Sequence, residues 1–185
     1  MEWGLPEWTV LALLRERSRH GFAIAALTGA DGPLGRVWRI PRPVIYRALG
    51  RVESAGQIEP LAVESGSGPQ RTVYALTDGG RDAVDAWLER PSEHVRQLRS
   101  DLLMKLALLD RRGLDATALL RAQRDVLEPI VTAIGDEREQ EEGFDSVLLA
   151  WRHANAGSAL RFVDDLIAES GSQAGRARRR AQDGD

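Results

Sequence analysis

Five arginines and no acidic residue lie between Arg36 and Arg51, although the formal net charge of the whole chain is −3. Arg47 and Arg51 are four residues apart in a segment, 43–55, whose pattern predicts an amphipathic helix. Guanidinium groups bind phosphate oxygens and the edge of guanine through paired hydrogen bonds. The spacing therefore predicts a cationic helix face that suits a nucleic-acid groove, and an ordinary solvated helix face is the alternative.

The predicted helix 43–55 has two different faces when its residues are placed at about 100° intervals. The inner face is apolar and consists of Ile45, Ala48, Leu49 and Val52. The outer face is small and cationic and consists of Pro43, Arg47, Gly50, Arg51 and Ser54, with Tyr46 at its edge and Glu53 to the side. We expect Arg42, Pro43, Tyr46, Arg47 and Arg51 to contact DNA. For Tyr46, packing beneath the neighbouring hairpin is an equal alternative.

Short elements surround this helix. Local patterns predict helices at 5–18, 22–27 and 78–90, a brief strand at 37–40, and two strands at 58–64 and 71–76. Three helices, a hairpin and a helix form the layout of a winged helix-turn-helix, in which the third helix enters the major groove. Gln70 and Arg71 follow the hairpin tip and are candidate DNA contacts, and for Arg71 an ion pair with Glu64 is the alternative.

Long amphipathic helices are predicted after Pro91, and their apolar stripes are too long for one small winged domain to bury. They either pack together or bury against a second copy. A palindromic operator needs two recognition helices, so a homodimer is expected. The expected domains are a DNA-binding domain at 1–91, a helical dimerisation domain at 92–170 and a disordered tail at 171–185. The tail contains Arg176–Arg180, for which a DNA-binding arm is the alternative.

Composition excludes several classes of protein. Hydrophobic residues make up 43% and charged residues 29% of the chain, which is typical of a globular protein. The sequence contains no cysteine, no apolar run long enough for a membrane span and no recognisable signal peptide, so we expect a cytoplasmic protein. Its three histidines lack metal-ligand spacing, and no catalytic motif is present. We expect no enzyme activity, no metal and no cofactor.

Five tryptophans are many for a chain of 185 residues. Packing in the core or in a dimer interface is the ordinary explanation for most of them. Trp8 and Trp151 lie on predicted helices that would face a dimer interface. Because an indole stacks well on a flat ligand, one of them is a candidate for binding a small aromatic effector.

Three motifs resemble those of the PadR family of transcriptional regulators. His20-Gly21-Phe22 resembles a family His-Gly-Tyr, and Val44–Leu49 with Glu53–Ile58 resembles the recognition helix. Gly68–Thr77 with Gly80 resembles the signature of the wing, the hairpin beside that helix. The resemblance implies a mainly α-helical, α+β winged helix-turn-helix with a two-stranded wing. It also implies a C-terminal helical dimerisation domain, as in the subgroup in which that domain is long.

The resemblance further implies a homodimeric repressor that a phenolic or drug-like compound releases from its operator. The sequence departs from the family at Phe22, at Pro41-Arg42-Pro43 and at Pro69, where hydroxyl groups or an arginine are usual. Operator affinity or sequence is expected to differ accordingly. The alternatives are a MarR-like winged-helix regulator and a winged-helix module that binds protein instead of DNA.

Overall fold

The computed structural model describes residues 3–64 and 70–182, with side chains described as far as residue 170. The chain forms two compact units. The N-terminal unit comprises the chain up to Glu89 together with Arg99–Leu114, and the C-terminal unit comprises Arg90–Leu98 and the chain from Asp115 onward. The boundaries expected at residues 91 and 170, and the disorder expected for 171–185, stay predictions.

The N-terminal unit begins with three helices, α1 (Leu5–Glu16), α2 (Gly21–Thr28) and α3 (Arg42–Ser54). α1 is buried along most of its length, and Val10, Leu11 and Leu13 are fully buried. α3 packs on α1 and α2 through the apolar face that the sequence predicted, since Ile45, Ala48, Leu49 and Val52 are all buried. The opposite face of α3 therefore points to solvent.

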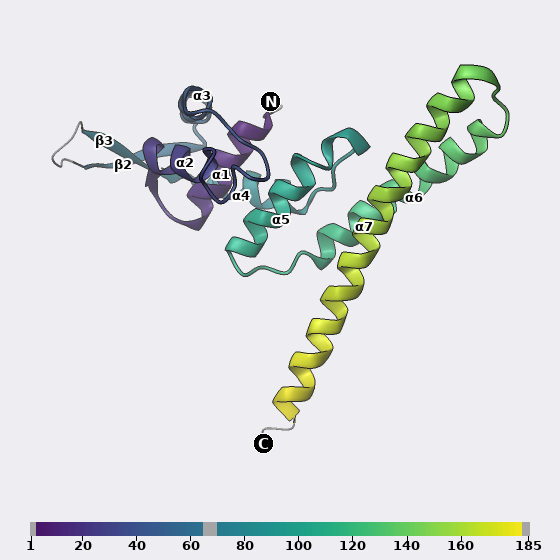
Figure 1. The fold of residues 1–185 in the computed structure, drawn as a ribbon. Coiled ribbons are helices and arrows are strands. Elements are labelled where there is room, and N and C mark those ends of the chain that lie inside the picture. The colour runs from purple at the N-terminus through teal and green to yellow at the C-terminus, as the bar shows by residue number, and fades with distance from the viewer. Residues whose placement is uncertain (1–2, 65–69, 183–185) are drawn as a thin grey trace. The chain divides into compact units, whose positions relative to one another are not determined.

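The sheet has three antiparallel strands in the order β1-β3-β2, formed by β1 (Arg19–His20), β2 (Ile58–Glu64) and β3 (Arg71–Leu76). The two wing strands have the bounds expected from the sequence. The third strand, β1, was not expected, and it pairs Arg19 with Tyr74 and His20 with Val73. Figure 1 shows β2 and β3 extending together away from the helices. The tip that joins them, residues 65–69, lies outside the described residues, Pro69 included.

The brief strand expected at 37–40 was wrong. The segment between α2 and α3 consists of turns, in which the amides of Val37 and Trp38 both donate to the carbonyl of Leu34 at 3.0 Å. These amides are therefore not available for a strand ladder. The turns are compact because Gly32 and Gly35 lie where an added Cβ would meet backbone carbonyl oxygens at 2.3 and 1.7 Å.

The end of α3 and the start of α4 (Asp78–Glu89) meet at a junction built from motif residues. Gly56 ends α3 with a φ of +69°, a conformation that favours glycine. The Thr77 hydroxyl accepts the amide of Gly80 at 3.1 Å and lies 2.8 Å from the carbonyl of Gly56. An added Cβ on Gly80 would lie 2.0 Å from the carbonyl oxygen of Gln57. Several residues of the family-like motifs therefore have a structural role.

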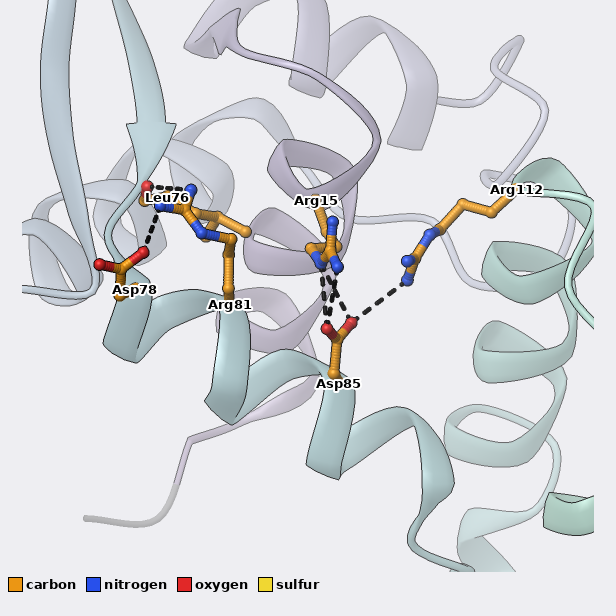
Figure 2. A network of polar contacts seen from close by, with 6 residues as sticks. All are labelled: Arg15, Leu76, Asp78, Arg81, Asp85 and Arg112. Atoms are coloured by element: carbon orange, nitrogen blue, oxygen red, sulfur yellow. Dashed lines mark hydrogen bonds and ion pairs between the residues drawn. The ribbon is translucent and has the colours of Figure 1, made fainter.

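Helix α5 (Asp101–Arg111) packs with the N-terminal unit although it follows Pro91 in sequence. Figure 2 shows the Asp85 carboxylate of α4 between Arg15 of α1, at 3.0 Å, and Arg112, which follows α5, at 3.4 Å. Arg111 pairs with Glu16 at 2.7 Å. The fully buried Lys105 contacts Asp101 at 2.8 Å. Paired charges and apolar burial thus both attach α5 to this unit.

The C-terminal unit contains the short 3-10 helix η1 (Val95–Gln97) and two long helices, α6 (Thr117–Arg138) and α7 (Gly143–Gln182). α6 and α7 run side by side as a hairpin, visible in green and yellow in Figure 1. Their contact is apolar and buries Leu120, Leu127, Ile134, Leu149, Ala156 and Val163. The side chain of Gln123 bonds both the amide and the carbonyl of Ser92, at 2.7 and 2.9 Å. Within the described part of the chain, no helix combines the length and the hydrophobicity of a membrane span.

Candidate nucleic-acid interface

The outer face of α3 carries the arginines that the sequence singled out. Arg42, Tyr46, Arg47 and Arg51 are all exposed, as is Pro43 at the start of the helix. Together with Trp3, the residues Arg47, Gly50, Arg51, Ser54 and Ala55 line a hollow of about 590 Å³. The face is therefore cationic, and the small residues Gly50, Ser54 and Ala55 between and beside its arginines leave a hollow that suits approach to a groove.

Arg51 has a protein partner that its sequence position did not indicate. Its Nη1 donates to Oε1 of Glu7 at 2.8 Å, and its guanidinium lies 5.9 Å from the ring centroid of Trp3. The other oxygen of Glu7 accepts the amide of Gly4, the residue that precedes α1, at 3.1 Å. The Glu7 carboxylate is buried, so part of the charge on Arg51 is neutralised within the protein.

The N-terminal end of α3 lies against α2 through aromatic side chains. An added Cβ on Gly21 would lie 2.7 Å from Leu49 and 3.1 Å from the ring of Tyr46, so the glycine allows that ring to approach α2 closely. The guanidinium of Arg42 lies 5.5 Å from the Tyr46 ring centroid and 5.1 Å from that of Phe22. Tyr46 therefore packs locally while part of its ring stays open to solvent.

Arg71, the first residue of β3, also turns toward Phe22. Its guanidinium carbon lies 4.7 Å from the Phe22 ring centroid. Glu64 stands opposite Arg71 in the strand register, but its carboxylate approaches Nε2 of His20 at 3.8 Å. The cross-strand pair considered for Arg71 and Glu64 is thus not among the ion pairs of the described residues. Gln70, next to the tip, is exposed.

The one acid on α3, Glu53, is engaged with the sheet. The Tyr74 hydroxyl donates to Oε2 of Glu53 at 3.4 Å. Burial raises the pKa of Tyr74 above its ordinary value of 10.0, and the neighbouring Glu53 charge raises it further. Because Glu53 faces the wing strand, the arginine face of α3 has no carboxylate of its own helix beside it.

Trp8 and Trp151 differ in their surroundings. Trp8 stacks on Trp87 with ring centroids 5.4 Å apart and planes 2° from parallel, so one face of the indole is covered. Trp151 is 66% exposed. It helps to line a cavity of about 450 Å³ in the C-terminal unit, together with Glu93, His94, Val95, Arg96, Ile130, Ile134, Arg152 and Asn155. Trp151 therefore borders a cavity large enough for a small molecule.

Sequence reasoning missed three residues that shape this surface. Trp3 and Glu7 reach Arg51 from the N-terminal end of the chain, and Phe22 lies between Arg42 and Arg71. The sequence signal for Glu7 was its place in the first turn of a helix, where a negative charge suits the helix dipole, and this does not identify a partner 44 residues away. No local signal indicates that two arginines share the ring of Phe22.

Comparison with known proteins relates the N-terminal part of the chain to one family. Residues 10–86 match the family described as "Transcriptional regulator PadR-like family". A probable transcriptional regulator of Mycobacterium tuberculosis is 28% identical over 94 residues, 51% of this chain and 49% of that protein. The negative transcriptional regulator PadR of Bacillus subtilis is 24% identical over 99 residues, 54% of this chain and 53% of that protein. The chain thus spans about half the length of these curated relatives.

Crystal structures of Bacillus subtilis PadR show what that protein binds. The complex with operator DNA is 18% identical to this chain, covers 89% of it and 98% of the solved chain, and has a TM-score of 0.45. The complex with p-coumaric acid is 17% identical, covers 90% and 96%, and has a TM-score of 0.41.

The match over residues 10–86 covers the helices α2 and α3, the wing strands and most of α1 and α4. It favours the PadR-like interpretation of the sequence over the MarR-like one. The family is one of transcriptional regulators and not of enzymes. The winged-helix segment of this chain, residues 10–86, thus matches the PadR-like family of transcriptional regulators.

Proposed function

We propose that this protein is a homodimeric transcriptional repressor that binds double-stranded DNA through α3 and the wing. The observation that carries the proposal is the exposed outer face of α3. Among the described residues, no acidic side chain forms an ion pair with Arg42 or Arg47. In a winged helix this face enters the major groove while the wing reaches the sugar-phosphate backbone. Arg47 is then placed to read a base edge, and Arg42 and Arg71 to contact phosphates.

Arg51 has a different role in this proposal. Its charge-assisted bond to the buried Glu7 holds the guanidinium at the end of α3. A fixed guanidinium still offers free N–H donors, because an arginine carries five and only one is donated to Glu7. Arg51 therefore serves as a fixed backbone contact, and Arg47 as the residue that reads sequence.

Repression is the proposed direction of regulation because the relative from Bacillus subtilis is named a negative transcriptional regulator. A repressor needs only to occupy the promoter, and a winged helix that binds one operator sequence specifically can do so. The alternative of a protein-binding module predicts acidic or apolar residues on the outer face of α3, and this face has arginines.

Selection from a random pool of duplex DNA tests the proposal. The full chain should enrich a palindromic motif at moderate salt, and the affinity for it should fall steeply as salt increases because phosphate counterions are released. A pool that returns no enriched motif would contradict sequence-specific binding and favour a protein-binding module.

A dimer is proposed from α7. Phe144, Val147, Leu148 and Trp151 recur at helical spacing on one face of α7 and are 43% to 77% exposed. Apolar residues at such spacing bury against another helix face when two copies associate. Light scattering should give twice the chain mass of 20.4 kDa at micromolar concentration. The double substitution Phe144→Glu and Val147→Glu should return the mass of one chain, and a single-chain mass for the unsubstituted protein would contradict the dimer.

An effector site is proposed at the cavity beside Trp151. Its apolar wall of Val95, Ile130 and Ile134 suits an aromatic ring, and Arg96, Arg152 and Asn155 suit a carboxylate or a hydroxyl group. Trp8 is the lesser candidate, since one face of its ring is covered by Trp87.

Tryptophan fluorescence tests the effector site, with p-coumaric acid as the first probe. A ligand in this cavity should quench the emission of Trp151, and Trp151→Phe should remove the quenching together with release from DNA. Trp38→Phe, which removes another exposed indole, is the control and should leave both unchanged. If quenching survives Trp151→Phe, this cavity is not the effector site.

A further inference from the structure

The side chain of Phe22 is exposed yet lies against two arginines from other elements. It projects from the first turn of α2 and is 42% exposed. Arg42 begins α3 and Arg71 begins β3, and their guanidinium carbons lie 5.1 and 4.7 Å from the same ring centroid. Both distances are within the range of cation–π attraction, and guanidinium is well suited to stacking on an aromatic ring.

Electrostatics alone would not hold these two arginines together. They carry like charges, and Arg42 stands at the first position of α3, where the helix dipole is also positive. Among the described residues neither arginine forms an ion pair with an acid. The contacts that position them are aromatic, since Phe22 contacts both and Tyr46 contacts Arg42. The arrangement therefore concentrates two positive charges at the ring of Phe22, and a bound anion would balance them.

Phe22 has no polar group with which to bind DNA itself. The family motif that His20-Gly21-Phe22 resembles has a tyrosine at this position, and phenylalanine keeps the ring and lacks the hydroxyl. Exposing an apolar ring to water is unfavourable. Phe22 lies on the outer side of α2 and is 42% exposed, so it covers little of the core. Its contacts with Arg42 and Arg71 account for its place.

We propose that Phe22 is a positioning residue, which holds Arg42 and Arg71 in place to bind phosphates of the DNA backbone. This inference rests on the proposed DNA-binding function and adds the group that prepares the surface for its ligand. Arginine side chains lose considerable rotamer freedom when they bind, so a ring that restrains them beforehand strengthens the binding. Contacts of this kind go to phosphate and not to base edges, so their effect is the same for all sequences.

Three variants of the full chain test this role. Phe22→Leu keeps an apolar side chain and removes the aromatic ring, Phe22→Tyr keeps the ring, and Arg42→Ala removes one of the restrained cations. The probes are a duplex of random sequence and the duplex selected from the random pool. Dissociation constants are measured over a series of salt concentrations, and thermal unfolding of each variant shows that the fold is retained.

Phe22→Leu should weaken binding to both duplexes alike, by roughly threefold to tenfold at moderate salt. The slope of log Kd against the logarithm of the salt concentration should decrease by about one to two, as expected when phosphate contacts are lost. Phe22→Tyr keeps the ring and should bind at least as tightly as the unsubstituted protein, with no loss of salt slope. Arg42→Ala should weaken binding less in the Phe22→Leu background than in the unsubstituted protein, because the two residues act together.

Unchanged affinity and salt slope in Phe22→Leu would overturn the inference and leave the proposed function intact. Equal weakening in Phe22→Leu and Phe22→Tyr would also overturn it, because the ring would then not be the feature that matters. If the unsubstituted protein binds neither duplex at low salt, the proposed function fails and the role of Phe22 fails with it.

Discussion

Arg51 of α3 and Glu7 of α1, 44 positions apart in the sequence, are joined by a hydrogen bond of 2.8 Å. The side chain of Glu7 is only 6% exposed, whereas that of Arg51 is 59% exposed. The same carboxylate accepts the amide of Gly4, so it connects the start of α1 with the last turn of α3. The two arginines on the outer face of α3 are therefore not equivalent.

Arg51→Ala should destabilise the N-terminal unit by about 1–3 kcal/mol at neutral pH, because it leaves the buried Glu7 carboxylate without its cation. Arg47→Ala is the matched control, since it removes the same charge one turn away. Its effect should stay within about 0.5 kcal/mol, as for most exposed positions. Urea unfolding followed by the signal of the winged-helix tryptophans measures both. Equal effects of the two substitutions would contradict the structural role of Arg51.

Arg47→Ala should instead act on recognition. If Arg47 pairs with a guanine, its loss should cost about 1–3 kcal/mol of binding and relax the preference at one position of the operator. The measurement is a competition of the selected duplex against duplexes with single base changes. Arg17→Ala, which removes an exposed arginine after α1, should leave both the affinity and the preference unchanged. An unaltered base preference in Arg47→Ala would show that Arg47 does not read a base edge in the groove.

Gly80→Ala should destabilise the fold by about 1–3 kcal/mol or more, because the new Cβ would lie 2.0 Å from a backbone carbonyl that has little freedom to move. Gly79→Ala is the neighbouring control. An added Cβ there meets only the Thr77 hydroxyl, at 4.0 Å, and alanine favours the helix by about 1 kcal/mol over glycine. Thermal unfolding should therefore rank Gly79→Ala at or above the unsubstituted protein and Gly80→Ala well below it. The opposite order would mean that the junction of α3 and α4 is differently packed.

Asp115 makes the start of α6 sensitive to acid. Its Oδ1 accepts the hydroxyl of Thr117 at 2.7 Å and the amide of Thr117 at 3.1 Å, and these bonds lower the pKa of Asp115 below its ordinary value of 3.8. A lowered carboxyl pKa contributes stability at pH values above 3.8, and this contribution is lost as the pH falls through the pKa of the folded state.

Asp115→Ala should consequently reduce stability at pH 7 by less than about 1 kcal/mol, since the group is exposed and screened by solvent. The gap to the unsubstituted protein should narrow as the pH falls below 3.8 and the carboxyl group takes up a proton. Asp125→Ala, which removes an exposed carboxylate from the middle of α6, should change stability by less than about 0.5 kcal/mol at pH 7. Urea titrations at pH 7 and at about pH 2 measure the gap, and a gap that persists unchanged at the lower pH would contradict this role of the Asp115 carboxylate.

Much of the candidate surface could be predicted from local patterns. The period of α3 separated Ile45 and Leu49 from Arg47 and Arg51, because apolar spacing on a helix determines which side is buried. The strands β2 and β3 have the predicted bounds, since the residues between Glu64 and Arg71 are glycine-, serine- and proline-rich and end both strands. The identity of the exposed arginines and the family were therefore accessible from the sequence.

Other features depended on which segments meet. β1 is two residues long, too short for any period to predict, and it forms only because β3 is there to pair with it. The turns at 37–40 replaced a predicted strand because their amides bond locally to Leu34. The packing of α5 with the N-terminal unit includes ion pairs of Arg111 with Glu16 and of Arg112 with Asp85. The partners in each pair are remote in sequence.

The same division applies to the site itself. The sequence by itself determined that α3 presents arginines to solvent, because helical spacing is a local property of the chain. Only the tertiary structure decided that Glu7 holds Arg51 and that Phe22 contacts both Arg42 and Arg71. Hydrogen bonds and cation–π contacts between distant segments depend on ångström-scale distances that the folded backbone sets, and residue spacing does not encode them.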